Sequence, residues 1–278
     1  MQLPAFYVDQ IIRTALQEDI NYLDTTTDLV IPEEARTKAH FLAKAEGVLC
    51  GLDVALRVFT LLDPSVSFTV YRRDGDRLQP GDVIAELEGP TRVLLKGERT
   101  ALNLAQHLSG IASATDRCVG LVAGTRASIT DTRKTLPGLR ALQKYAVTVG
   151  GGKNHRFNLS DGAMLKDNHI DAAGGITAAV AAVRAQLGHM VKLEVETRTL
   201  DEVREALDVG ADVIMLDNMD CDTMRRAVDL AGGRALLEAS GGITDETLRA
   251  VAETGVDIIS IGALTHSVKA LDISMKIR

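Results

Sequence analysis

The chain has 278 residues, of which 46% are hydrophobic and 25% charged, so it is long enough for one large barrel or for two domains. Aromatic residues make up 3% and tryptophan is absent, so any core must be built from Ala, Val, Leu and Ile. The formal net charge of −7 argues against nucleic acid as the main partner, because domains that bind nucleic acid usually carry a basic balance.

The beginning of the chain reads as an amphipathic helix over residues 1–16 and not as a signal peptide, because Asp9 and Arg13 interrupt its apolar residues. Elsewhere no apolar run reaches the roughly 18 residues that a membrane span needs. The three cysteines, Cys50, Cys118 and Cys221, are scattered and lack the spacing of a zinc site, which indicates reduced thiols. We therefore expect a cytoplasmic protein with no membrane contact.

The residues before about position 100 alternate between apolar and polar in short stretches, at 38–43, 67–70 and 83–88. Turn signals lie between them, at Asp74-Gly75-Asp76 and at Gln79-Pro80-Gly81-Asp82. A period of two between turns predicts antiparallel strands, which together with a few helices make an α+β domain.

From about residue 98 onward the pattern becomes strand, loop and helix in repetition. Apolar segments of strand length lie at 127–130, 163–165, 191–195, 213–216, 235–237 and 258–261, and helical stretches follow at 172–187, 200–209 and 245–253. Such alternation predicts a parallel sheet. A doubly wound sheet would give the same local signals. We favour a barrel because nearly every strand ends in a charged or glycine-rich step, and closure would bring all six ends round one ligand.

Two successive glycine loops are candidates for a phosphate site. Ser240-Gly241-Gly242 leads from a strand into a helix, and Gly262-Ala263 does so one unit later. Glycines let backbone N–H groups approach an anion, and barrels commonly bind phosphate at their last two loops. The alternative is a pair of tight turns in which glycine serves packing only.

Positive side chains cluster in two adjacent βα segments of this acidic chain; they are Arg133, Lys134, His155, Arg156 and Lys166. Gathering them at one mouth is unfavourable unless anions neutralise them, which predicts a site for carboxylate or phosphate. The alternative is a solvated surface run.

Two carboxylates, Glu196 and Asp217, each close an apolar strand beside this cluster. Such a pair can hold Mg²⁺ through water or face a developing positive charge, and its alternative role is to form salt bridges with the same Arg and Lys residues. His155 and His169 lack the spacing of a zinc site. Together these patterns predict a barrel enzyme for a multiply anionic substrate that carries phosphate, with Mg²⁺.

Ordered motifs extend over essentially the whole chain. They are Asp24-Thr25-Thr26-Thr27, residues 98–103 and 108–112, Asp131-Thr132-Arg133-Lys134-Thr135, residues 137–140, 144–147 and 150–152, His155-Arg156, residues 165–169, Glu194-Val195-Glu196, Leu216-Asp217-Asn218 and residues 238–243. In content and order they resemble the quinolinate phosphoribosyltransferase family.

The resemblance implies a type II phosphoribosyltransferase fold: an N-terminal α+β domain, an incomplete (β/α) barrel, and a C-terminal tail that returns to the first domain. On this sequence we place the first domain at 1–107, with 266–278 returning to it, and the barrel at 108–265. The implied activity is that of a decarboxylating pentosyltransferase. It converts quinolinate and phosphoribosyl pyrophosphate, with Mg²⁺, to nicotinate mononucleotide, pyrophosphate and CO₂ in NAD biosynthesis.

The resemblance also implies roles for individual residues. The catalytic residues would be Lys134, Glu196 and Asp217, of which the two carboxylates would also organise Mg²⁺. The substrate-binding residues would be these three with Arg99, Thr132, Arg133, His155, Arg156, Lys166, Ser240, Gly241, Gly242, Gly262, Ala263 and His266. Arg133, His155, Arg156 and Lys166 would clamp the two carboxylates of quinolinate, and the glycine loops would hold the 5′-phosphate.

The family pattern places Arg99 across a dimer interface, so the expected assembly is a homodimer whose active sites are shared between chains. A molybdenum-associated branch of the fold and a nicotinate-specific relative remain alternatives, although both would be expected to relax the clamp on the second carboxylate. A non-catalytic anion sensor is an alternative of another class, and it would have no need of both Glu196 and Asp217.

Overall fold

The computed structural model describes residues 3–277, which divide into two compact units. The first unit contains the chain up to Asp116, residues 135–151 and the chain from Leu264 onward. The second contains residues 117–134 and 152–263. None of the helices in the described part of the chain is both long and apolar enough to span a membrane.

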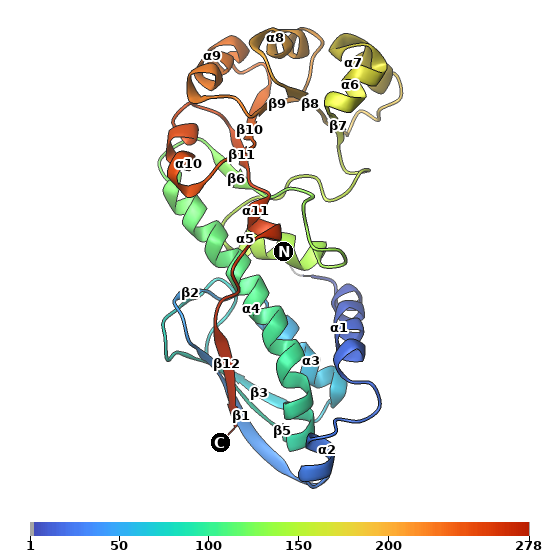
Figure 1. The fold of residues 1–278 in the computed structure, drawn as a ribbon, viewed down its shortest axis with the longest axis vertical. Helices are drawn as coiled ribbons and strands as arrows, with labels where there is room; N and C mark the ends of the chain where they lie inside the picture. The colour runs from blue at the N-terminus through green and yellow to red at the C-terminus, as the bar shows by residue number, and fades with distance from the viewer. Residues whose placement is uncertain (1–2, 278) are drawn as a thin grey trace. The chain divides into compact units, whose positions relative to one another are not determined.

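The first unit is built on a four-stranded antiparallel sheet in the order β12-β1-β5-β3 (Figure 1). Its strands are β1 (Arg36–Ala43), β3 (Ser67–Val70), β5 (Val83–Pro90) and β12 (Ile273–Ile277), and a small second sheet pairs β2 (Gly47–Val48) with β4 (Arg77–Leu78). Alternation in β1 buries Ala39, Phe41 and Ala43, as the period of two predicts. The last strand, β12, pairs antiparallel with β1, which confirms that the C-terminal tail returns to the N-terminal domain.

The helices of the first unit pack around a core of small and branched apolar residues in which the Phe41 and Phe59 rings lie 6.1 Å apart. They are α1 (Ala5–Asp19), α2 (Thr27–Val30), α3 (Leu52–Leu62), most of the long α4 (Thr91–Leu121), α5 (Arg140–Val149) and most of α11 (Ala263–His266). The expected N-terminal helix is α1, which begins after Pro4; Met1 and Gln2 lie outside the described residues.

The second unit is a six-stranded parallel sheet in the order β6-β11-β10-β9-β8-β7. Its strands are β6 (Ser128–Thr130), β7 (Ala163–Leu165), β8 (Leu193–Thr197), β9 (Val213–Asp217), β10 (Leu236–Ser240) and β11 (Ile258–Ser260). Strands β7 to β11 follow one another in chain order and β6 lies beside β11, which is the circular order of a barrel opened between β6 and β7. The predicted incomplete barrel is confirmed.

The helices of this unit are α6 (Asp167–Ala173), α7 (Ile176–Arg184), α8 (Leu200–Asp208), α9 (Cys221–Ala231) and α10 (Asp245–Ala252). In Figure 1, α7 to α10 line the outer side of the curved sheet. The single helix expected at 172–187 is wrong: Gly174 and Gly175 adopt φ of +86° and +128°, which end α6 and separate it from α7.

The expected closure of the sheet is wrong, because β6 and β7 do not pair within residues 3–277, although the strand ends still face one cavity. A single bridge between Thr130 and Lys153 instead extends the free edge of β6. The segment that follows Lys153 therefore enters the open side of the barrel, and it carries His155 and Arg156.

Candidate active site

The carboxyl ends of the six strands surround one cavity of about 560 Å³. Its lining contains most of the residues expected from the sequence: Thr132, Arg133, Lys134, His155, Arg156, Lys166, Glu196, Asp217, Ser240, Gly241 and Gly242. Ser240 pairs in register with Asp217 on β9 and with Ser260 on β11. Paired residues of neighbouring strands share a face of the sheet, so the parallel register itself aims these side chains into the cavity.

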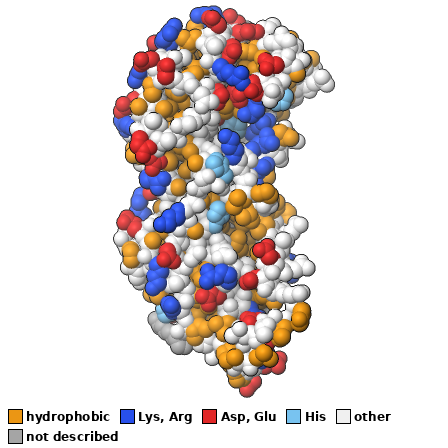
Figure 2. All heavy atoms as spheres, viewed as in Figure 1, with side chains coloured by type: hydrophobic (Ala, Val, Ile, Leu, Met, Phe, Trp, Pro, Cys, Tyr) orange, Lys and Arg blue, Asp and Glu red, His pale blue; other side chains and the backbone are white. Residues whose placement is uncertain are grey.

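The positive residues of the cavity crowd one another. Arg156 is half-buried, and its Nη1 donates a hydrogen bond to the Gly162 carbonyl at 2.8 Å. Burial, and after it the charge of Arg133, lower the pKa of the Arg156 guanidinium, while the Glu194 carboxylate opposes this shift. On the face drawn in Figure 2, Lys and Arg side chains gather in the upper part with histidines and acidic side chains beside them. Mutual repulsion of this kind is relieved by a bound anion.

The two expected carboxylates both face the cavity but differ in their partners. Lys166 Nζ donates to Glu196 Oε2 at 3.1 Å, so Glu196 forms a salt bridge with one of the cations of the cluster. Asp217 Oδ2 accepts a hydrogen bond from Asn218 Nδ2 at 2.9 Å. Hard carboxylate oxygens on one cavity wall are a donor set that suits Mg²⁺.

The glycine loop after β10 has a steric reason for its composition. Gly241 adopts φ of +94°, and a Cβ atom there would lie 2.6 Å from Cγ of Asn218. Asn218 itself has a positive φ of 53°, and its backbone N–H donates to the Ser240 carbonyl at 2.9 Å. The ends of β9 and β10 are thus fitted to each other, and only glycine satisfies both the conformation and the space at position 241.

Four expected residues do not line this cavity. Gly262 and Ala263 follow β11 in the second unit without reaching the lining. Arg99 on α4 and His266 on α11 belong to the first unit, and both are exposed.

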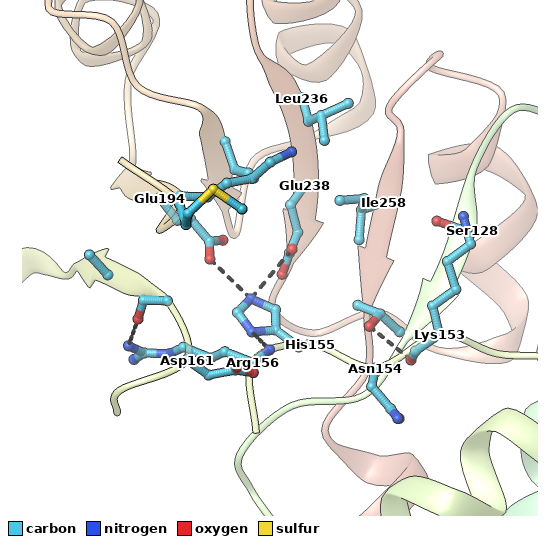
Figure 3. Close-up of a pocket in the computed structure, with 16 residues that line it drawn as sticks. Ser128, Lys153, Asn154, His155, Arg156, Asp161, Glu194, Leu236, Glu238 and Ile258 are labelled. Atoms are coloured by element: carbon cyan, nitrogen blue, oxygen red, sulfur yellow. Dashed lines mark hydrogen bonds and ion pairs between the residues drawn. The ribbon is translucent and has the colours of Figure 1, made fainter. Parts of the chain in front are cut away.

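Two buried glutamates beside the cavity, Glu194 and Glu238, were not among the site residues predicted from the sequence. His155 Nε2 lies 3.0 Å from Glu194 Oε2 and 3.6 Å from Glu238 Oε2, and Figure 3 shows both carboxylates turned toward the ring. The signal was present: Glu194 lies two residues before Glu196, and Glu238 two before Ser240, so strand periodicity places each pair on one face.

This three-residue cluster brings together atoms that could also ligate a metal. However, His155 Nδ1 accepts a hydrogen bond from the Arg156 backbone N–H at 2.8 Å, so Nε2 carries the ring proton and faces the carboxylates as a donor. The geometry is that of a hydrogen-bonded cluster.

Glu238 is 2% exposed. Burial, and then the Glu194 carboxylate, raise the pKa of Glu238 to about 7, against the opposing influence of His155, the nearby Ser260 hydroxyl and Lys166. Near neutral pH this side chain is therefore a carboxylic acid for a large part of the time.

Comparison with known proteins agrees with this geometry over both units. Residues 24–109 match the N-terminal domain and residues 111–276 the C-terminal domain of the family described as quinolinate phosphoribosyl transferase. A protein of Bacillus subtilis (strain 168) named "Probable nicotinate-nucleotide pyrophosphorylase (carboxylating)" is 50% identical over 260 residues, covering 94% of this chain and 90% of the relative. The mitochondrial quinolinate phosphoribosyltransferase (decarboxylating) 2b of Nicotiana tabacum is 43% identical over 293 residues, covering 99% and 83%.

A solved structure extends the likeness to three dimensions. The crystal structure of NadC from Streptococcus pyogenes superposes with a TM-score of 0.97 at 45% identity, covering 100% of this chain and 99% of the other. Sequence motifs, fold and cavity lining thus agree, and the chain belongs to the quinolinate phosphoribosyltransferase family.

Proposed function

We propose that this chain is a decarboxylating quinolinate phosphoribosyltransferase. It joins the ring nitrogen of quinolinate to C1 of the ribose of phosphoribosyl pyrophosphate, and it releases pyrophosphate and CO₂ to give nicotinate mononucleotide for NAD biosynthesis. One observation carries the proposal: a cluster of cations, two carboxylates and a glycine loop all line a single cavity at the strand ends.

The cations suit a substrate with two carboxylates. Arg133 and Arg156 supply planar guanidinium groups that bind carboxylate through paired hydrogen bonds, and Lys166 supplies a point charge. His155 lines the same cavity and its Nδ1 accepts from the Arg156 backbone N–H, so it positions this backbone and is a further candidate contact for the substrate. Lys134, whose backbone N–H donates to the Thr132 hydroxyl at 3.0 Å, lies on the same wall and suits the pyrophosphate of the donor.

The two carboxylates suit the charge that develops as pyrophosphate leaves. The bond from C1 to the leaving oxygen stretches before the new bond to nitrogen is complete, which places positive charge on the ribose ring. Glu196 and Asp217 face this charge, and fixed negative groups stabilise it without reorganisation. When bound, Mg²⁺ would neutralise the pyrophosphate, with Glu196 and Asp217 as its candidate protein ligands, directly or through water.

The loop Ser240-Gly241-Gly242 presents backbone N–H groups that can donate hydrogen bonds to the 5′-phosphate. Gly262 and Ala263 are further candidates from the next loop. The first turn of α10 already carries Asp245 and Glu246, so the loop's own N–H groups, more than the helix dipole, would hold the anion. His266 is a weaker candidate for the same phosphate.

We further propose a homodimer in which Arg99 completes the site of the partner chain. Large apolar side chains on and around α1 and α2 are exposed, including Phe6 (78%), Leu29 (72%) and Val30 (70%), and Figure 2 shows apolar atoms over this region. Exposed apolar surface of this kind marks an interaction site. The free thiols of Cys50, Cys118 and Cys221 support a reducing, cytoplasmic location.

The activity is tested by supplying quinolinate labelled in its C2 carboxylate together with phosphoribosyl pyrophosphate. We expect release of labelled CO₂ and of pyrophosphate in equal amounts, with nicotinate a poor substitute for quinolinate. Neither a nicotinate-specific enzyme nor an anion sensor would release CO₂, so its absence would refute the proposal.

The shared site is tested by mixing Arg99→Ala and Lys134→Ala chains, each nearly inactive alone, through joint unfolding and refolding. If Arg99 acts across the interface, each mixed dimer contains one intact site, and random pairing restores about a quarter of wild-type activity by symmetry. No recovery, with mixed dimers confirmed by mass, would mean that each chain uses its own Arg99.

A further inference from the structure

The second unit contains a further cavity of about 350 Å³ at the opposite end of the same strands. Its lining includes the first residues of five strands: Ser128, Ala163, Val213, Leu236 and Ile258. We call it the lower chamber, where lower means the amino ends of the strands. Among residues 3–277, only His155, Arg156 and Glu238 line both the lower chamber and the cavity that we assign to the substrates. Figure 3 shows the Glu238 carboxylate turned toward the His155 ring.

The proposed reaction needs a proton at a defined place. When the C2 carboxylate leaves as CO₂, the carbon–carbon bond breaks and its electron pair stays on C2, beside the positively charged ring nitrogen. Nicotinate mononucleotide forms only when C2 then takes up one proton. Until that happens CO₂ can recombine with the carbanion, so a positioned acid speeds net decarboxylation.

We propose that Glu238 is the general acid that delivers this proton to C2. The inference rests on the proposed function and assigns a catalytic group to the decarboxylation step. The proton passes from the Glu238 carboxyl group to C2, and a C–H bond forms. Glu238 is left as a carboxylate and regains a proton from solvent by way of the lower chamber. Each turnover consumes one proton, as the overall reaction requires.

The position of Glu238 carries the assignment. It is a buried side chain that lines the substrate cavity on one side and the lower chamber on the other. Its Oε2 lies near His155, whereas its buried Oε1 has no hydrogen-bond partner among the described residues. A proton on Oε1 is therefore not shared with a protein acceptor, while Oε2 lies on the side of His155.

The charge state of Glu238 supports the same role. The groups that face it are Glu194 from β8, Ser260 from β11, His155 from the segment after Lys153, and Lys166 after β7. Burial and Glu194 raise the pKa of Glu238 to about 7, close to the value at which an acid is most effective in neutral solution. The carboxylates of bound quinolinate would raise this pKa further by like-charge repulsion.

The other proton-bearing groups of the cavity are less suited. Arginine does not give up its proton in proteins, which excludes Arg133 and Arg156. Lys166 is engaged with Glu196, and Lys134 suits the pyrophosphate of the donor, so the charge of both is needed to hold the substrates. His155 directs its Nε2 proton at the two glutamates.

Glu238→Gln tests the assignment, because the amide keeps the shape of the side chain but has no acid proton. In single-turnover experiments with rapid quenching, pyrophosphate release and CO₂ release are timed separately. We expect pyrophosphate release near the wild-type rate, CO₂ release slowed by roughly 10²-fold or more, and accumulation of the undecarboxylated mononucleotide. The wild-type rate of CO₂ release should fall as pH rises through the pKa of Glu238, which bound quinolinate moves above the value of about 7, and this fall should be absent from the variant.

Glu194→Gln is the matched control, since Glu194 contacts the same His155 nitrogen but lines only the lower chamber. It should affect both steps through the position of His155, and because Glu194 raises the pKa of Glu238 it should also move the high-pH fall in CO₂ release to lower pH without removing it. Glu238→Asp, which keeps an acid one methylene shorter, should restore part of the CO₂ release and serves if the amide variant folds poorly. Loss of both steps in equal measure in Glu238→Gln, or of neither, would overturn the proposal. A wild-type enzyme that releases no pyrophosphate with quinolinate would instead refute the proposed function.

Discussion

The fit between Gly241 and Asn218 predicts a large and selective effect of a single methyl group. In Gly241→Ala the backbone must keep φ near +94°, which costs an L-residue about 1–2 kcal/mol. The new Cβ also overlaps the Asn218 amide, which then gives up its hydrogen bond to Asp217, worth about 1 kcal/mol. A free loop relaxes to avoid this cost of about 2–3 kcal/mol, and binding must then restore the conformation, so the affinity for phosphoribosyl pyrophosphate should fall by roughly 30- to 150-fold.

Two further variants separate strain from overlap. Gly242 has φ of +61°, but an added Cβ there would lie 4.0 Å from Asn218 Oδ1, so Gly242→Ala should show the strain alone. In an Asn218→Gly background, Gly241→Ala should cost less by about 1 kcal/mol, because the overlap is gone.

The assay is calorimetric binding of phosphoribosyl pyrophosphate and of quinolinate to each folded variant. Quinolinate affinity should change little, since its clamp lies on other strands. An overlap with Asn218 is refuted if Gly241→Ala binds no worse than Gly242→Ala, if the affinity for both ligands falls equally, or if the Asn218 and Gly241 changes are strictly additive.

Three other predictions concern five substitutions in the site. Glu196→Gln and Asp217→Asn should fold normally but lower kcat by roughly 10²–10³-fold; full activity would return both residues to a salt-bridge role. Arg133→Ala and Arg156→Ala should raise the KM for quinolinate roughly 10- to 150-fold while leaving that for phosphoribosyl pyrophosphate nearly unchanged, and equal rises would show the clamp to be misassigned. Because the pKa of Glu238 is raised from 4.5 to about 7, this residue destabilises the fold as pH rises through that range, by up to about 3 kcal/mol. Chemical denaturation should therefore find Glu238→Gln more stable, relative to wild type, at pH 8 than at pH 5, and a difference independent of pH would contradict the raised pKa.

Much of the site could be predicted because its residues occupy strand ends. Glu196, Asp217 and Ser240 each follow a short apolar run, and a parallel sheet places such ends at one edge. The prediction therefore needed only the pattern of apolar segments and no knowledge of long-range packing.

The features that were not predicted depend mainly on contacts between residues far apart in the sequence. Glu194 and Glu238 lie within apolar strands. A charged residue there breaks the apolar pattern, and its burial cannot be predicted until its partner is known. That partner is His155, which comes from a loop and reaches the interior through a gap that local sequence does not reveal. The break between α6 and α7 was signalled by Gly174-Gly175, but the apolar period continues across it.

The gap between β6 and β7 links the fold to the chemistry. A closed barrel fills its interior with side chains from its own strands, in layers. Here, within residues 3–277, the free edge of β6 pairs with Lys153 alone, and the chain beyond it brings His155 and Arg156 into the barrel interior from the side. Glu194 and Glu238 can remain buried in the barrel interior because the His155 ring contacts both carboxylates. The Arg156 side chain is held beside them by its hydrogen bond to the Gly162 carbonyl. The opening thus lets a loop place a cation and a proton-bearing group within the barrel, where strands alone would have supplied only the carboxylates.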